Sequence, residues 1–335
     1  MADAVEIRIE RLPVGHVRAD DFKAVSAVLK SPEHGEVHVR NKWMSLDPYM
    51  RLGLSPQAGY VAALNPGDML NGPAVGIIEA SGHPDFPVGS HVLSQMGWRS
   101  QFVSQPEDCG AALLVDVDVP LEWHLGLLGL TGVTAWLGIS KVLRPQKGET
   151  IFISGAAGAV GSIACQMAKL RGARVLGSAG SPDKVDWLVN ELGVDVATNY
   201  REQDLGAFLD ENAPEGVDCY FDNVGGGMLD TFLVRTKPGG RIGLCGAMSQ
   251  YEESDYRAGP ANFFSVIENN LQLLGFNAFR LSGEEWAEAT TELKRLVKEQ
   301  GLKPCHSIVR GIKNASLAFA QMFEKGQLGK LLVEI

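Results

Sequence analysis

The chain has 335 residues, with 30 basic and 40 acidic side chains, and therefore a formal net charge of −10 at pH 7. This length predicts about two domains, and the acidic balance argues against nucleic-acid and membrane-surface binding, because no basic stripe is present to release phosphate counterions. The five cysteines are scattered singly, which fits free thiols in a reducing cytoplasm rather than a disulfide framework.

The first part of the chain, residues 1–127, predicts a β-rich, barrel-like domain. Short apolar runs at residues 36–40, 75–79 and 90–94 are separated by Pro, Gly, Asn and Asp, a pattern typical of strands joined by turns. The N-terminus carries charges among its apolar residues and so has no signal-peptide core. The longest uncharged run, residues 125–140, is shorter than the roughly 20 residues that a membrane span needs. We therefore expect a soluble, cytoplasmic protein.

Strand and helix signals alternate in the second part, residues 128–299. An apolar strand at residues 150–154 leads into a glycine-rich turn and then into a stretch whose apolar residues have helical spacing. A second strand at residues 174–178 is followed by Ser181 and Pro182, which are typical of a helix start. This alternation predicts an α/β domain with a doubly wound parallel sheet and helices on both of its faces.

The glycine-rich turn is the first chemical signal. Gly155, Gly158 and Gly161 stand between a predicted strand and a predicted helix at G-x-x-G-x-x-G spacing. Glycines in this context let backbone N–H groups approach a pyrophosphate, which lies at the positive end of the helix. The sequence therefore predicts a dinucleotide site, and a tight strand–helix turn without a ligand is the alternative interpretation.

The end of the second strand indicates which dinucleotide would bind. A site for NAD places a carboxylate there to hold the ribose 2′-hydroxyl. Residues 177–181 read Gly-Ser-Ala-Gly-Ser, without an acid, and Lys184 follows on the first helical turn, where an ammonium can meet a 2′-phosphate. We therefore expect NADP(H) as the cofactor. A solvated surface lysine is the alternative for Lys184.

Other chemistries find less support in the sequence. His83 and His91 are eight residues apart with no cysteine near them until Cys109, so we expect no metal site. No nucleophile elbow or Ser/His/Asp constellation is evident. The Asp-Pro pair before Tyr49 favours a turn that would present the phenol beside apolar residues, where it could donate a hydrogen bond to a developing oxyanion. From the residues alone, a packing role for Tyr49 is favoured over this chemistry.

Four segments together resemble one known family. They are residues 44–51 (Met-Ser-Leu-Asp-Pro-Tyr-Met-Arg), 155–161 (Gly-Ala-Ala-Gly-Ala-Val-Gly), 220–226 (Tyr-Phe-Asp-Asn-Val-Gly-Gly) and 245–251 (Cys-Gly-Ala-Met-Ser-Gln-Tyr). In this order they are similar to the zinc-independent medium-chain dehydrogenases/reductases, in the branch of leukotriene B4 dehydrogenase/prostaglandin reductase, the alkenal double-bond reductases and the curcumin reductases. The resemblance covers nearly the whole chain.

The resemblance implies a fold and an activity. A GroES-like β domain would be formed by residues 1–127 and completed by residues 300–335, whose strand signals also suggest that they fold back onto it. A Rossmann domain, residues 128–299, would be inserted between them. The implied activity is NADPH-dependent reduction of the carbon–carbon double bond of α,β-unsaturated ketones and aldehydes, by a homodimer acting on a small molecule.

The resemblance also implies which residues contact the cofactor. They are Thr134, Gly158, Ala159, Val160, Gly161, Lys184, Tyr200, Asn223, Cys245, Gly246, Ser249, Tyr251, Phe276, Asn277, Ala278 and Gln327. Residues 158–161 would hold the pyrophosphate, and Lys184 and Tyr200 the 2′-phosphate. Asn223 would hydrogen-bond the cofactor, while residues 245–251 and 276–278 would flank its nicotinamide half.

Two departures from the family pattern bear on the reaction. Glu268 stands where several members place a tyrosine, a proposed acid or oxyanion donor, and Gln327 replaces an asparagine. An outward, solvated Glu268 is the simpler expectation, because burial of a carboxylate carries a desolvation cost. We therefore expect Tyr49 to be the catalytic residue, with water as a second proton source.

Three alternative functions remain open at this stage. A quinone reductase would share the fold and the cofactor but accept enones poorly. An alcohol dehydrogenase would reduce the carbonyl group and yield an allylic alcohol. A non-catalytic NADPH-binding protein would bind the cofactor with little turnover.

Overall fold

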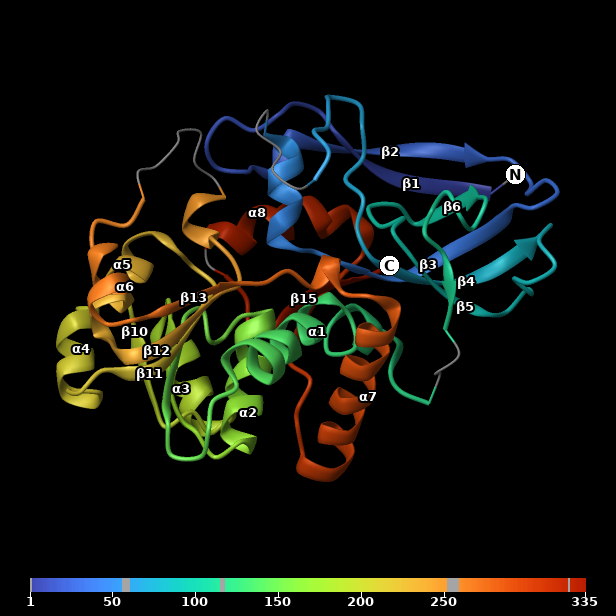
Figure 1. The fold of residues 1–335 in the computed structure, drawn as a ribbon. Helices are drawn as coiled ribbons and strands as arrows, with labels where there is room; N and C mark the ends of the chain where they lie inside the picture. The colour runs from blue at the N-terminus through green and yellow to red at the C-terminus, as the bar shows by residue number, and fades with distance from the viewer. Residues whose placement is uncertain (1, 56–60, 115–117, 252–258, 325) are drawn as a thin grey trace. The chain divides into compact units, whose positions relative to one another are not determined.

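The computed structural model describes residues 2–55, 61–114, 118–251, 259–324 and 326–335 (Figure 1). The chain divides into two compact units. The first consists of Met1–Gly126, His306–Gly326 and Leu331–Ile335, and the second of Leu127–Cys305 and Gln327–Lys330. None of the helices in the described residues has the length and the apolarity that a membrane crossing needs.

The first unit is built on a seven-stranded sheet and a two-stranded one. The larger sheet contains β3 (Val37–Ser45), β4 (Ala74–Ser81), β5 (His91–Ser94), β6 (Gln101–Ser104), β7 (Ala112–Leu113), β14 (His306–Arg310) and β15 (Lys330–Glu334). The smaller sheet pairs β1 (Ala2–Ile9) with β2 (Phe22–Leu29), antiparallel. The last strand of the chain, β15, runs antiparallel to β3, with Val333 opposite Met44. Short antiparallel strands joined by turns are what the spaced apolar runs predict.

The helices of the first unit close its apolar core. They are the 3₁₀ helices η1 (Ala19–Asp21), η2 (Pro48–Leu54), η3 (Leu121–Leu125) and η7 (Ile312–Asn314), and the α-helix α8 (Ala315–Glu324). Buried Phe319 of α8 packs edge-on against buried Trp98, with ring centroids 5.3 Å apart. Tyr49 of η2 packs, partly buried, against the same core.

The second unit holds a six-stranded sheet in which every pair of strands that is described runs parallel. Its strands are β8 (Thr150–Ile153), β9 (Arg174–Ala179), β10 (Val196–Asn199), β11 (Val217–Asp222), β12 (Thr236–Leu244) and β13 (Gln272–Gly275), in the order β10-β9-β8-β11-β12-β13. The chain thus winds outward from β8 in one direction and from β11 in the other. The predicted doubly wound parallel sheet is confirmed, and its switch point lies between β8 and β11, where such sheets bind ligands.

Helices connect these strands (Figure 1). They are α1 (Leu130–Trp136), which continues as the π-helix η4 (Leu137–Leu143), α2 (Ala159–Leu170), α3 (Pro182–Asn190), α4 (Leu205–Asn212), α5 (Gly226–Arg235), α6 (Phe264–Glu268) and α7 (Gly283–Gln300), with the short 3₁₀ helices η5 (Met248–Gln250) and η6 (Ala278–Arg280). Aromatic rings fill part of the core between the strands and the helices. The ring centroids of buried Tyr220 and Phe232 are 3.9 Å apart in a stacked arrangement, and those of Phe152 and Phe232 are 4.5 Å apart.

Candidate functional site

The turn between β8 and α2 leaves little room for side chains at its three glycines. Gly155 has a φ of +58°, in the left-handed region. A Cβ at Gly161 would clash with the carbonyl oxygen of Gly155 and lie 2.8 Å from Ala156 Cα. Gly158 is the N-cap of α2, and a Cβ there would lie 3.2 Å from the same carbonyl oxygen. Backbone N–H groups at the start of a twelve-residue helix are thus kept free of side chains, as pyrophosphate binding requires.

The turn after β11 is hydrogen-bonded to this glycine-rich turn. The backbone N–H of Asn223 donates to Ser154 Oγ at 2.9 Å, and its side-chain Nδ2 donates to the Ser154 carbonyl oxygen at 2.7 Å. The turn after β12 joins them, because the N–H groups of Cys245 and Gly246 donate to the Asp222 carbonyl oxygen at 2.9 and 3.1 Å. Asn223, Cys245 and Gly246 are therefore brought to one edge of the sheet.

Two further predicted residues lie on this edge. Ser249 donates its backbone N–H and its hydroxyl to the Val224 carbonyl oxygen, at 3.1 and 2.8 Å. A Cβ at Gly246 would lie 3.5 Å from the Tyr251 hydroxyl, which places that phenol beside the turn. The predicted residues of the segment 245–251 thus form one folded loop around the end of β12.

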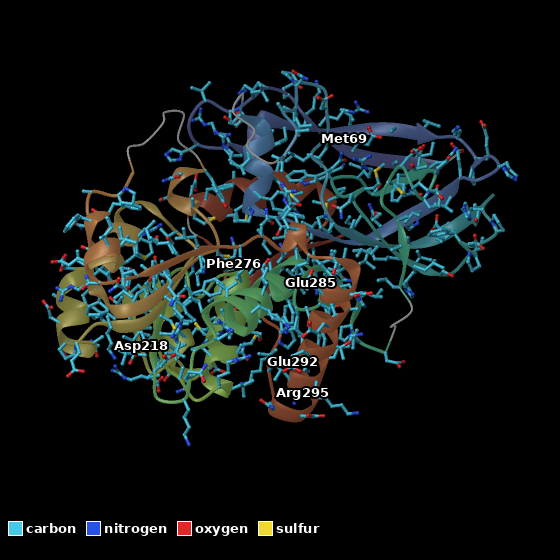
Figure 2. All side chains as sticks on the ribbon, in the orientation of Figure 1. Met69, Asp218, Phe276, Glu285, Glu292 and Arg295 are labelled. Carbon is cyan, nitrogen blue, oxygen red and sulfur yellow. The ribbon has the colours of Figure 1, made fainter. Side chains whose placement is uncertain are left out.

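The segment after β13 contributes an aromatic ring. Phe276 packs edge-on against Phe221 of β11 with ring centroids 5.6 Å apart, and Figure 2 shows Phe276 at this end of the sheet. Asn277 accepts a hydrogen bond from the Phe279 backbone N–H at 3.0 Å, and Ala278 is buried. Thr134 lies half-buried in α1. In the described part of the chain, the side chains of Asn277 and Thr134 are not joined to the hydrogen bonds around Asn223.

Gln327 belongs to the second unit although it stands near the end of the chain. Two residues later, the N–H of Gly329 donates to the Ala157 carbonyl oxygen at 2.8 Å, and Gly329 forms a parallel bridge with Gly158. Gly329 has a φ of +64°, and a Cβ there would lie 2.8 Å from Cys305 Cβ. The hydrogen bond and the bridge of Gly329 therefore bring the segment that contains Gln327 to the glycine-rich turn.

A cationic cluster lies beyond the ends of β9 and β10. The parallel register pairs Asn199 with Ala179, so the next residues of both strands are neighbours. A Cβ at Gly180 would lie 3.1 Å from Tyr200 Oη and 3.3 Å from Arg201 Nε. Partial burial, and then the charge of Arg201, lower the pKa of Lys184. Lys184, Tyr200 and Arg201 therefore gather at one place.

Arg201 was missed in the sequence interpretation. Its guanidinium lies 5.9 Å from the ring centroid of Tyr200, its neighbour in the chain. In the sequence, only its position next to Tyr200 pointed to Arg201. The register of β10 against β9 shows that the Arg201 side chain reaches Gly180.

The first unit places Tyr49 in the 3₁₀ helix η2, which the predicted Asp-Pro turn begins. Asp47 is the N-cap and accepts a hydrogen bond from the Ser45 hydroxyl. Tyr49 is half-buried between this cap and buried Met50. In the second unit, Glu268 ends α6 with its side chain exposed to solvent.

Among the residues that the structure describes, no group of three or more His, Cys, Asp or Glu side chains is arranged to hold a metal ion.

Comparisons with known proteins cover almost the whole chain. Residues 6–111 match a family model described as the N-terminal domain of oxidoreductase, and residues 159–295 match one described as a zinc-binding dehydrogenase. The chain is 36% identical to the NADP(+)-dependent 2-alkenal reductase of Nicotiana tabacum over 98% of its own length and 97% of the relative's. It is 37% identical to prostaglandin reductase 1 of Bos taurus, over 96% of both chains. CurA of Vibrio vulnificus, solved in complex with NADPH, aligns with a TM-score of 0.92 at 30% identity, over 98% of both chains.

Proposed function

Because the chain belongs to the zinc-independent medium-chain dehydrogenase/reductase family, we propose that it is an NADP-dependent oxidoreductase that reduces the carbon–carbon double bond of α,β-unsaturated ketones and aldehydes. The observation that carries this proposal is the glycine-lined turn at the sheet's switch point, with a cationic cluster at the end of the neighbouring strand β9. The names of the relatives supply the substrate class: a 2-alkenal reductase and a prostaglandin reductase.

The cofactor would be held at the carboxyl ends of the strands of the second unit. Residues 158–161 receive the pyrophosphate at the start of α2. Lys184, Tyr200 and Arg201 receive the 2′-phosphate, where two cations and a phenol supply charge-assisted hydrogen bonds. The nicotinamide half is flanked by the residues that follow β11, β12 and β13 and by those beside the glycine-rich turn, namely Thr134, Asn223, Cys245, Gly246, Ser249, Tyr251, Phe276, Asn277, Ala278 and Gln327.

Beyond binding, the reaction requires the protein to stabilise the negative charge that develops on the substrate. When bound, the nicotinamide supplies a hydride to the β-carbon of the enone. Negative charge then collects on the substrate's carbonyl oxygen as an enolate, and a hydrogen-bond donor lowers the energy of that state. We assign this donor role to the Tyr49 hydroxyl, and the α-carbon takes its proton from Tyr49 or from water. One hydride and one proton thus convert the enone into the saturated ketone or aldehyde.

NADPH oxidation with a small enone and with a long-chain enal tests the proposal, with the products identified by mass spectrometry and NMR. We expect saturated ketones and aldehydes. Allylic alcohols as products would indicate an alcohol dehydrogenase, and turnover of quinones alone would indicate a quinone reductase. NADPH binding without turnover of any of these substrates would indicate a non-catalytic binder.

We also propose that the protein is a cytoplasmic homodimer. The strand β13 is last in the order of its sheet, and edge strands favour pairing with another chain. Phe263, Phe264 and Ile267, in and just before the helix α6 that precedes β13 in the chain, are 55, 71 and 67% exposed. Exposed apolar side chains of this kind support contact with a second copy, and the described cysteines are unpaired thiols, as a reducing cytoplasm would keep them.

A further inference from the structure

Asp222 is a buried carboxylate that sequence reasoning did not assign to the site. It ends β11 at the sheet's switch point and is only 1% exposed. Four donors converge on one of its oxygens, Oδ1: the Tyr220 hydroxyl at 2.7 Å, the N–H groups of Gly225 and Val224 at 2.8 and 2.9 Å, and Ser154 Oγ at 3.3 Å. Oδ1 thus acts as the common acceptor of N–H and O–H groups that come from different turns.

The backbone of Asp222 extends the same set of contacts. Its carbonyl oxygen accepts from the N–H groups of Cys245 and Gly246, at the end of β12. Ser154, which lies beside Oδ1, also accepts the backbone N–H of Asn223. One residue is therefore hydrogen-bonded to all three turns that we propose to surround the cofactor, those after β8, β11 and β12.

The desolvation cost of burying the Asp222 carboxylate argues against a purely structural role for this residue. The second oxygen, Oδ2, is also buried and has no hydrogen-bond partner among the described residues. Burial accordingly raises the pKa of Asp222, although the N–H of Gly225 and the Tyr220 hydroxyl oppose the shift. An orphaned oxygen on a buried carboxylate is costly, and the turn that leads into α5 would need only the bonds to the N–H groups of Val224 and Gly225.

The titratable neighbours of Asp222 stay neutral. Burial, and then the charge of Asp222, raise the pKa of the Tyr220 hydroxyl well above its usual range. The same two causes raise the pKa of the Cys245 thiol to about 12. Tyr220 and Cys245 therefore add no negative charge beside Asp222 near neutral pH.

We propose that Asp222 is a positioning residue for cofactor binding, which holds the turns after β8, β11 and β12 in the shape that receives the pyrophosphate and nicotinamide half of the dinucleotide. This inference rests on the proposed NADP-dependent function. The 2′-phosphate end lies outside its reach, because Lys184, Tyr200 and Arg201 are held by β9 and β10.

The test compares Asp222→Asn with a matched control on the same strand, Asp218→Asn. Asp218 also ties neighbouring strands: its Oδ2 accepts the Thr150 N–H at 2.8 Å and pairs with Lys237 Nζ at 3.0 Å. It lies near the amino end of β11, however, and Figure 2 shows it away from Phe276, toward the opposite end of the sheet. Both variants remove one charge from β11 at nearly constant volume.

The dissociation constants of NADPH and of 2′,5′-ADP, with the melting temperature, are measured for each variant by fluorescence and calorimetry. For Asp222→Asn we expect NADPH to bind about tenfold more weakly, because the charge-assisted hydrogen bonds of the carboxylate to the turns after β8 and β11 are reduced, and 2′,5′-ADP to change by less than about threefold. For Asp218→Asn we expect a lower melting temperature with both dissociation constants within about twofold of wild type.

Two results would overturn the inference: NADPH binding by Asp222→Asn within about twofold of wild type, or a parallel loss of NADPH and 2′,5′-ADP binding in both variants. If Asp222→Asn does not fold, Tyr220→Phe replaces it, because this variant keeps the ring stack on Phe232 and removes one donor to Oδ1. We expect the dissociation constant of NADPH to rise about threefold. An unchanged dissociation constant in Tyr220→Phe would also overturn the inference. A wild-type protein that binds NADPH but reduces no enone would contradict the proposed function alone, since the role of Asp222 is measured by binding.

Discussion

Lys184 and Arg201 bring two positive charges to the end of β9, the position where a site for NAD needs a carboxylate. Partial burial, and then the charge of Arg201, lower the pKa of Lys184, so the two cations lie close enough to interact. A phosphate is attracted by both cations and can accept charge-assisted hydrogen bonds from them. We therefore propose these two residues as the basis of the preference for NADPH over NADH.

Replacement of either cation should therefore weaken NADPH and leave NADH almost unchanged. A hydrogen bond to a charged group contributes roughly 1.5–3 kcal/mol, and we expect Lys184→Ala to approach this range. Arg201→Ala should lose less, about 1 kcal/mol, because the exposed guanidinium is screened by solvent. Fluorescence titration with both cofactors measures the effect. Lys298→Ala, an exposed lysine on α7, is the control, and an equal loss of NADPH and NADH binding in Lys184→Ala would contradict the assignment.

Tyr49 can be tested by removal of a single oxygen atom. Tyr49→Phe keeps the ring that packs, half-buried, against the core of the first unit, so we expect the melting temperature to be nearly unchanged. Loss of one donor to a developing oxyanion typically lowers kcat by about 10²–10³. Steady-state kinetics with an enone measures this, and NADPH affinity serves as the internal control. A kcat within about threefold of wild type would leave Tyr49 with a packing role only.

At the scale of elements, local patterns predict the strand–turn–helix of the cofactor site. The apolar run of β8 and the glycines that follow are adjacent in the chain, so the pattern of one short segment is sufficient. Arg201 and Asp222 were missed for the opposite reason. Their partners, Gly180 and the turn after β12, are brought to them by the pairing of parallel strands, which one sequence does not reveal.

The π-helix η4, which continues α1, also escaped prediction. It contains Gly138, where a Cβ would lie 2.8 Å from Phe276 Cζ and would clash with the ring of Phe221. Those two rings come from β11 and from the segment after β13, far away in the chain. The local geometry of η4 is therefore set by packing between distant segments, which overrides what helix propensity indicates.

The glycine-rich turn yields a prediction with a built-in control. In Gly161→Ala the new methyl group meets the backbone of Gly155 and Ala156, so we expect the free energy of unfolding to fall by about 1–3 kcal/mol and NADPH binding to weaken. Gly227→Ala adds the same group in α5, where nothing lies within 4 Å. That variant should keep its stability or gain up to about 1 kcal/mol. Urea denaturation measures the free energy of unfolding of both variants. A value for Gly161→Ala equal to that of wild type would show that the turn has room for a side chain at this position.

At the scale of the whole molecule, the net charge of −10 opposes association. Two copies repel each other through the solvent most strongly at low salt, because the charges are then screened less and the repulsion extends over a longer distance. A homodimer must therefore be held by short-range contacts, and the edge strand β13 with the exposed side chains of Phe263, Phe264 and Ile267 offers them. Added salt removes the repulsion while apolar burial persists.

The proposed homodimer should accordingly become tighter as salt is raised, and sedimentation velocity at several salt concentrations measures its dissociation constant. Phe264→Glu places a charge on the apolar surface and should produce monomers, because an unpaired carboxylate cannot be buried without a large desolvation cost. Leu317→Glu changes an apolar side chain of α8 that is 50% exposed in the first unit, and it should remain dimeric. Dimers that persist in Phe264→Glu, or that dissociate equally in both variants, would contradict the proposal that the exposed apolar side chains before β13 form the contact between copies.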